Sequence, residues 1–322
     1  MHPRAPPLIE IGLTAAIVAV EADEPLILLT ADSTNERTGL PFGPFNPLNH
    51  RTFEIGLRAW VEAQTGLRVG YVEQLYTFGD RGRHSGPDDS GPHVVSIGYL
   101  ALTRMPDHRD ALRAAAAGFQ PWYHFFPWED WRDGQPKILD KTIRPLLAAW
   151  ARQSDPPESR RALGRADRVR LYFCNAGNPW DEERVLERYE LLCEAGLAGA
   201  AASVSFLERL PRLQHPLTGD HNRLLANAVG ELRRRVKWQP VVFELMAEAF
   251  TLYELQKTVE AILGPHLHKQ NFRRLVEAGG LVEPTGEHRL RTGGRPARLF
   301  RFRQDVLLER LAPGVRVKAG RA

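Results

Sequence analysis

The sequence has 322 residues, of which 43% are hydrophobic and 25% charged, and its formal net charge is +4. This composition is typical of a globular protein with two or three domains, and the sequence has no low-complexity tract. The sequence excludes a membrane-spanning chain, because no apolar run approaches the roughly 20 residues that a bilayer span needs. The apolar stretch Leu13–Val20 is followed by acidic residues and lacks the basic flank of a signal peptide, so we expect a cytoplasmic protein.

The charge is distributed unevenly along the chain. From Lys269 to Ala322 the sequence has thirteen Lys or Arg and five Asp or Glu, so the rest of the chain is mildly acidic. A basic end of this kind is typical of a module that binds a polyanion.

The first hundred residues have the pattern of a small α/β unit. Two apolar, β-branched runs, Thr14–Val20 and Pro25–Ala31, flank an acidic turn and predict a hairpin. Apolar residues then recur at helical spacing and stop at Gly66, as expected for a helix with a glycine after its last turn. The predicted elements after the hairpin are a loop over Pro41–Asn49, a helix over Arg51–Gln64, and strands over Val69–Tyr76 and Val94–Thr103.

The middle of the chain, residues 105–215, has a less regular pattern. It begins with the aromatic segment Phe119–Trp131, whose rings could stack on nucleobases but which we interpret as hydrophobic core. The elements predicted after it are a helix over Ile138–Trp150, a linker over Gln153–Arg168, a short strand over Val169–Cys174 and a helix over Asp181–Ala195.

The C-terminal third predicts a winged helix-turn-helix. An amphipathic helix over Asp220–Val236 leads to a first short helix over Pro240–Ala249. Thr251 and Glu254 form a capping box that opens a second helix, which stops at Gly264. A third helix over His268–Ala278, two strands over Leu281–Glu283 and Arg298–Arg303, and a loop over Thr285–Pro296 complete the motif.

The third helix has a polar, basic side that suits DNA. Phe272, Leu275 and Val276 are expected to face inward, and Arg, Asn and Gln are the side chains that read base edges in the major groove. The predicted base-reading residues are Lys269, Gln270, Asn271, Arg273 and Arg274. The wing residues predicted to reach phosphate or the minor groove are Arg289, Arg291, Arg295 and Arg298. The alternative is that the winged helix docks a protein.

Two separate parts of the sequence resemble a known family, the Nudix-related transcriptional regulators of bacterial NAD metabolism (NrtR-like). The N-terminal part comprises Gly43, Arg51–Leu67 and Tyr71–Gly79. The C-terminal part comprises the segments Phe243–Leu245, Phe250–Gln256, Asn271–Arg274 and Gly294–Phe302. The resemblance covers residues 10–103 and 217–303, so residues 105–215 would make this an enlarged branch of the family.

The resemblance implies an α+β fold, with an N-terminal Nudix-like α/β sandwich and a C-terminal winged helix-turn-helix. We expect a Nudix-like, effector-sensing domain over 8–216, with 105–215 as its extension. A linking helix over 217–239, a DNA-binding domain over 240–304 and a basic tail over 305–322 follow.

The Nudix motif itself is degenerate in this sequence. The family's hydrolases hold magnesium with helical glutamates in G-x5-E-x7-R-E-U-x-E-E-x-G-U. Anchoring that motif on Gly66 places Ala59-Trp60 at the Arg-Glu position and Ala63-Gln64 at the Glu-Glu position, and Arg51 replaces the first Glu. A rival alignment keeps Glu62 as one ligand at the cost of an inserted residue. Since Glu54, Arg58 and Glu62 stand four residues apart, we interpret them as an exposed ladder of ion pairs.

The resemblance therefore implies a regulator that binds a nucleotide without hydrolysing it. We expect a homodimeric repressor of NAD-related genes, controlled by ADP-ribose or an NAD-type nucleotide, with no catalytic residue, metal or cofactor. The candidate effector contacts are Arg37, Arg51, Tyr76 and Phe78. Two alternatives remain at this point: a divergent Nudix hydrolase that uses Glu62, and an interaction module.

Overall fold

The structure is a computed structural model, and it describes residues 9–31, 38–79, 93–107, 109–153, 163–173, 179–199, 217–289 and 296–306. These residues form two compact units. The first takes the described residues of Met1–Ala19, Leu26–Pro121 and His215–Ala228, and the second takes those of Val20–Pro25, Trp122–Gln214 and Val229–Ala322. Within the described residues, no helix has the length and apolar character that crossing a membrane would need.

Within the residues that the structure describes, the first unit is built on a mixed sheet of seven strands. Its main path runs from β3 (Thr38–Gly39) through β2 (Glu24–Ala31), β1 (Ile9–Glu21) and β6 (His93–Leu102) to β5 (Tyr71–Phe78). β1 and β2 are joined by Ala22 and Asp23, which both have positive φ. Such a turn matches the twist of a two-residue hairpin, so the predicted hairpin is confirmed. β1 also pairs in parallel with β6. The remaining strands of this sheet are β4 (Phe42–Pro44) and β7 (Ala117–Pro121).

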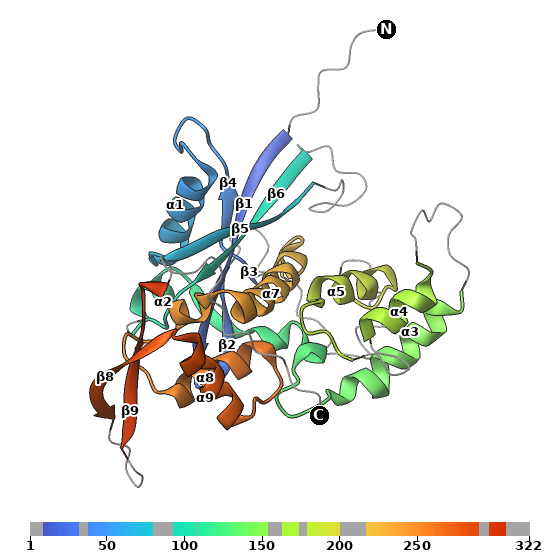
Figure 1. Cartoon of the computed structure of the whole chain (residues 1–322). Coiled ribbons are helices and arrows are strands. Elements are labelled where there is room, and N and C mark those ends of the chain that lie inside the picture. The colour runs from blue at the N-terminus through green and yellow to red at the C-terminus, as the bar shows by residue number, and fades with distance from the viewer. Residues whose placement is uncertain are drawn as a thin grey trace. The chain divides into compact units, whose positions relative to one another are not determined.

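Two helices of this unit pack on the sheet, namely α1 (Phe53–Thr65) and the part of α7 (His221–Trp238) up to Ala228, both labelled in Figure 1. On α1, Leu57 and Val61 are fully buried in the core that β1 and β6 contribute to. On β6, Gly98 points to the opposite face, where a Cβ would lie 2.8 Å from the Leu224 side chain of α7. The α/β sandwich predicted for the N-terminal part is therefore confirmed. The short helix α2 (Asp110–Ala114) precedes β7.

The α1 helix forms where its sequence signals place it. Thr52 is the N-cap, and its hydroxyl accepts from the Ile55 amide at 3.2 Å. Gly66 ends the helix with a φ of 70°, in the left-handed region that favours glycine. One local prediction needs correction, because the predicted loop Pro41–Asn49 contains β4, which pairs with β1.

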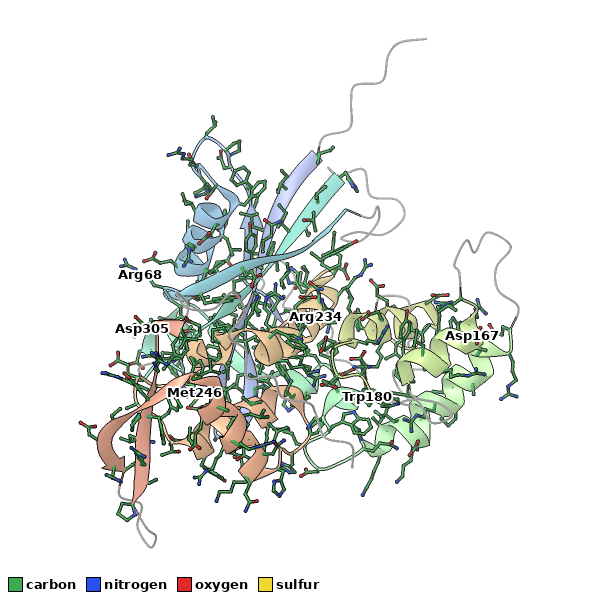
Figure 2. The ribbon with its side chains drawn as sticks, in the orientation of Figure 1. Arg68, Asp167, Trp180, Arg234, Met246 and Asp305 are labelled. Carbon is green, nitrogen blue, oxygen red and sulfur yellow. The ribbon has the colours of Figure 1, made fainter. Side chains whose placement is uncertain are left out.

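The second unit begins with an aromatic core. The single-turn 3-10 helices Trp122–His124 and Pro127–Glu129 bury Trp122, Trp128 and their aromatic neighbours, which confirms the core interpretation of this segment. Trp180, labelled in Figure 2, joins the cluster with its ring 4.8 Å from that of Trp131. The helices that follow are a π-helical turn at Leu139–Ile143, α3 (Arg144–Ala151), α4 (Arg165–Phe173) and α5 (Val185–Glu194).

The predicted strand over Val169–Cys174 is wrong, because its described residues belong to α4. Val169 and Phe173 are four residues apart and both buried, which is a helical spacing. Arg168 is also buried, with its guanidinium paired to Glu194 of α5 at 2.5 Å. Alternation over so short a segment does not distinguish a strand from a helix face.

The C-terminal part of the second unit is a winged helix-turn-helix (Figure 1). It comprises a 3-10 helix at Pro240–Leu245, α8 (Leu252–Leu263), α9 (Lys269–Gly279), β8 (Val282–Arg289) and β9 (Ala297–Phe302). Phe250 forms a bridge with Phe300, and Phe243 stacks on Phe302 at 4.4 Å. The predicted capping box of Thr251 and Glu254 is confirmed.

Two predicted bounds in this domain need correction. The helix predicted over Pro240–Ala249 is only a 3-10 helix to Leu245, because Met246 is extended and the chain then runs on to pair at Phe250. β8 runs to Arg289 rather than ending at Glu283. Its pairing with β9 changes register between Pro284 and His288, where Gly286 has a φ of 85°.

The described residues of 122–199 belong to the same unit as the winged helix. Within this unit, Glu129 forms buried ion pairs with Arg188 of α5 and Arg233 of α7. The predicted division of the chain into domains, with 8–216 as one Nudix-like domain, stays a prediction.

Candidate functional site

The outer face of α9 carries the five residues that the sequence selected for base reading. Phe272 and Val276 are buried, at 1% and 0% exposure, so this helix has a fixed inner side. Arg274 donates to the Asn271 side-chain oxygen at 3.0 Å. The exposed residues of its N-terminal half are Lys269, Gln270, Asn271, Arg273 and Arg274. The structure therefore brings together cationic and amide side chains on one open face.

The turn that leads into α9 is held by a buried carboxylate, Glu260. One Glu260 oxygen accepts from the Leu267 amide at 2.9 Å, and the other accepts from the Lys257 ammonium at 2.9 Å. Gln256 donates to both Glu260 and the Leu267 carbonyl, each at 2.8 Å. Burial would raise the pKa of Glu260, but the Leu267 amide and the side chains of Lys257, Gln256 and His266 outweigh it and lower the pKa.

The Glu260 carboxylate makes the free energy of unfolding depend on pH. Because the pKa of Glu260 is lower in the folded state than its ordinary 4.5, the ionised group stabilises the fold above pH 4.5. That stabilisation is lost as the pH falls through the lowered value. Glu260→Gln should cost about 1–3 kcal/mol at pH 7 and lose less stability on acidification than the wild type. Urea unfolding between pH 6 and 3 measures this, and parallel pH profiles would contradict it.

The wing arginines differ in how much of their hydrogen-bonding capacity is already used. Arg289 pairs with Glu254 and donates to the Ala249 carbonyl at 3.2 Å, so it ties the wing to the start of α8. Arg298 is exposed, with its guanidinium 5.6 Å from the Phe300 ring centroid. Arg291 and Arg295 lie outside the described residues. Among the described wing arginines, Arg298 is therefore better placed than Arg289 to reach phosphate.

The candidate effector residues of the first unit are not alike. Arg51 is exposed directly before the N-cap of α1. Tyr76 is 61% exposed on β5, where the pairing with β6 is irregular. Phe78 is buried at 2% exposure, and the Arg223 guanidinium of α7 lies 5.0 Å from its ring centroid. Phe78 is therefore part of the core, and Arg37 lies outside the described residues.

The face of α1 that would hold metal in the resembled hydrolases carries a different set of contacts here. The Trp60 indole donates to the Pro44 carbonyl at 3.0 Å. Gln64 donates to the Phe42 carbonyl at 2.6 Å and accepts from the Phe42 amide at 3.1 Å. Trp60 and Gln64 thus bind β4 to α1, an arrangement that we call the β4 latch (Trp60, Gln64 and Phe42–Pro44).

The two glutamates of α1, Glu54 and Glu62, both pair with arginines. Glu54 pairs with Arg58 at 2.9 Å, as the ladder interpretation predicted. Glu62 departs from that ladder and pairs with Arg68 at 2.7 Å. Arg58 also donates to the carbonyls of Val69 and Gly70, so it joins α1 to the start of β5. Within the described residues, no three His, Cys, Asp or Glu side chains are grouped as metal ligands.

The β4 latch depends on a glycine. A Cβ on Gly43 would lie 2.2 Å from the Trp60 ring, so any larger residue forces the indole to move. We expect Gly43→Ala to break the indole hydrogen bond and to lower the free energy of unfolding by about 1–3 kcal/mol. Chemical denaturation measures the change. Gly118→Ala is the matched control, because nothing lies within 4 Å of its added Cβ. Equal stabilities of the two variants would contradict this account of Gly43.

Two polar residues of α7, His221 and Arg223, were not among the candidates selected from the sequence. His221 is buried on α7, and its Nδ1 accepts from the Leu40 amide at 3.1 Å. Its ring also makes an edge contact with Phe42 at 5.2 Å. A signal was present, since His221 and Arg223 open a long amphipathic helix. Nothing in the linear sequence indicated that they would meet residues of β3–β5.

A Nudix-like sandwich with a C-terminal winged helix defines a class of two-domain proteins, and comparison with known proteins gives the family of the second domain. Residues 242–302 match the family described as the NrtR DNA-binding winged helix domain. The C-terminal domain of this chain is therefore a winged helix of the NrtR type.

One curated relative and two solved structures are also similar to this chain. The chain is 40% identical over 90 residues to a protein of Acinetobacter baylyi described as an ADPR responsive transcriptional repressor NtrR. That match covers 28% of this chain and about a third (36%) of the relative. Shewanella oneidensis NrtR, crystallised with a 27mer DNA, has a TM-score of 0.55 at 20% identity, covering 92% of this chain and 94% of that one. A MutT/nudix family protein from Enterococcus faecalis has a TM-score of 0.51 at 14% identity, covering 94% and 89%. At these identities the two structures show a shared fold.

Proposed function

We propose that this protein is a DNA-binding transcriptional repressor controlled by an ADP-ribose or NAD-type nucleotide. The observation that carries the proposal is the open face of α9, where five basic or amide side chains lie on the third helix of an NrtR winged helix domain. Such helices enter the major groove with their N-terminal residues. The partly matching relative from Acinetobacter is itself described as an ADPR-responsive repressor. Regulation of NAD-related genes is the target that the resemblance suggests.

The nucleotide would bind to the Nudix-like unit. Arg51 and Tyr76 are exposed there and can offer a cation for phosphate and a ring for a base, and Arg37 is a further candidate. A ligand changes DNA binding only if it binds one arrangement of the protein more tightly, with couplings on the order of 1–3 kcal/mol. The α7 helix is the proposed link, because its residues up to Ala228 belong to the first unit and those from Val229 to the second.

The proposal includes binding without hydrolysis. Trp60 and Gln64 stand at the positions where the resembled hydrolases place metal-binding glutamates, and the β4 latch engages both side chains. A relocated site on Glu62 is disfavoured by its pairing with Arg68. The expected result is that magnesium releases no AMP from ADP-ribose in the presence of the protein. Magnesium-dependent AMP release that Glu62→Gln abolishes would instead support the hydrolase alternative.

A homodimer and a cytoplasmic location complete the proposal. Dimers suit operators with two half-sites about one helical turn apart. The direct test is a mobility-shift assay at low salt with DNA from upstream of the protein's own gene and a scrambled duplex as control. A shift with the upstream DNA at protein concentrations that leave the scrambled duplex free is expected. Absence of any shift would overturn the repressor function.

A further inference from the structure

The C-terminal end of α8 is held from outside its own helix. The last carbonyls of a helix lack intrahelical partners, and cations or donors stabilise that end. Here the Tyr123 hydroxyl donates to the Ala261 carbonyl at 2.9 Å. The Arg233 Nε donates to the Ile262 carbonyl, also at 2.9 Å. One donor comes from the extension and the other from the second half of α7.

Arg233 is fixed in this position by a fully buried cluster. Its guanidinium is 0% exposed and donates to the Glu129 carboxylate at 2.8 Å, the Glu182 carbonyl at 3.0 Å and the Glu129 carbonyl at 3.1 Å. It also donates to the Tyr123 oxygen at 3.3 Å. Burial would lower the pKa of Arg233, but Tyr123 and Glu129 outweigh it, so the guanidinium stays charged. Each of its three nitrogens therefore donates to a protein acceptor.

Glu129 connects this arginine to a second one. The Glu129 carboxylate accepts from Arg188 of α5 at 2.6 and 2.8 Å, and Arg188 is also 0% exposed. The Asp181 carbonyl accepts a further Arg188 hydrogen bond at 2.8 Å. Two guanidiniums share one carboxylate, and backbone carbonyls, including that of Ile262 at the end of α8, accept further hydrogen bonds from them. A buried, hydrogen-bonded network of this kind makes the local structure more rigid.

The turn after α8 packs directly on the extension. Gly264 ends α8 with a φ of 97°, and a Cβ there would lie 3.3 Å from that of Trp131. Only Pro265–His268 separate this glycine from α9, and Glu260 holds the Leu267 amide within that turn. On α7, a Cβ at Gly230 would lie 2.6 Å from the Glu183 carbonyl. The extension, the second half of α7 and the α8–α9 turn are therefore in close contact.

We propose that Tyr123 and Arg233 are positioning residues for DNA binding, which fix the end of α8 and thereby the direction in which α9 presents its base-reading face. The inference rests on the proposed function. It assigns a role to the extension, whose aromatic and charged residues brace the recognition helix. A DNA-reading helix loses affinity when its orientation is loosely defined, because binding must then order it.

Tyr123→Phe tests this inference with little change in packing, since it removes one hydroxyl. Tyr189→Phe is the matched control, because Tyr189 is a buried tyrosine of the same extension on α5. Amide exchange at residues 262–268 and affinity for upstream and scrambled DNA are measured for both. We expect the amides of residues 262–268 to exchange faster in Tyr123→Phe than in the wild type. We also expect this variant to bind upstream DNA about 3- to 10-fold more weakly, so that the ratio of its affinities for upstream and scrambled DNA decreases. Arg233→Lys, which removes the Nε donor, should change both readouts in the same direction.

The outcomes separate this inference from the proposed function. If Tyr123→Phe matches Tyr189→Phe in turn exchange and in DNA preference, the positioning role is overturned. Faster exchange with unchanged DNA preference overturns it as well, because the clamp would then be structural only. If the wild type binds no upstream DNA, the repressor function fails, while turn exchange still decides whether the two side chains fix α8.

Discussion

Glu129→Gln is expected to lower the free energy of unfolding by about 3–5 kcal/mol, the range for removing one partner of a buried ion pair. The carboxylate is 1% exposed and is the shared counter-charge of Arg188 and Arg233, which are both 0% exposed. Glutamine keeps the size of the side chain but leaves two buried cations without a negative partner. Urea denaturation followed by circular dichroism measures the loss.

Glu194→Gln is the control for this prediction. Glu194 pairs with the buried Arg168 in the same unit, but its side chain is 27% exposed, so water can replace part of the lost interaction. We expect a smaller destabilisation than for Glu129→Gln. A Glu129→Gln protein within about 1 kcal/mol of the wild type would show that the cluster contributes less than its burial indicates.

The second large effect concerns the base-reading face. The double variant Arg273→Ala/Arg274→Ala should weaken operator binding by about 1–3 kcal/mol for each side chain that reads a base. Both residues are exposed on α9, so folding should change little. Fluorescence anisotropy with upstream and scrambled duplexes measures the preference. We expect the affinity for the upstream duplex to fall more than the affinity for the scrambled duplex.

Arg298→Ala provides the contrast with that double variant. As an exposed wing residue, Arg298 is expected to contact phosphate, so its loss should weaken binding to every sequence alike. The slope of log affinity against log salt should also become shallower by about one. The opposite result would be a smaller preference for upstream over scrambled DNA in Arg298→Ala and an unchanged preference in Arg273→Ala/Arg274→Ala. That result would assign base reading to Arg298 and phosphate contact to the two α9 arginines.

Much of the fold could be predicted because local signals and tertiary packing agree. The hairpin at Ala22-Asp23, the end of α1 at Gly66 and the capping box at Thr251 are short-range signals that the structure retains. The inner and outer sides of α9 also followed from the spacing of Phe272 and Val276. In these elements, hydrogen bonding and burial depend on residues that are close in sequence.

The sites that sequence reasoning missed depend on distant partners. Arg233 lies on the buried stripe of α7 with Val229 and Val236, so a charge at an apolar position was a detectable signal. Its partner Glu129 is 104 residues away and has no periodic signature. The β4 latch was missed for the same reason, since Gln64 and Phe42 meet only when β4 folds against α1.

The effect of ADP-ribose on operator affinity tests the central claim most directly. Anisotropy titrations of wild-type protein against labelled upstream duplex, with and without saturating ADP-ribose, give the two dissociation constants, and chromatography of the same samples shows whether the nucleotide stays intact. We predict that saturating ADP-ribose changes the dissociation constant for the upstream duplex by about 5- to 150-fold and that the nucleotide stays intact. Equal dissociation constants, or nucleotide consumed during the titration, would contradict a sensor that binds without cutting and controls the winged helix.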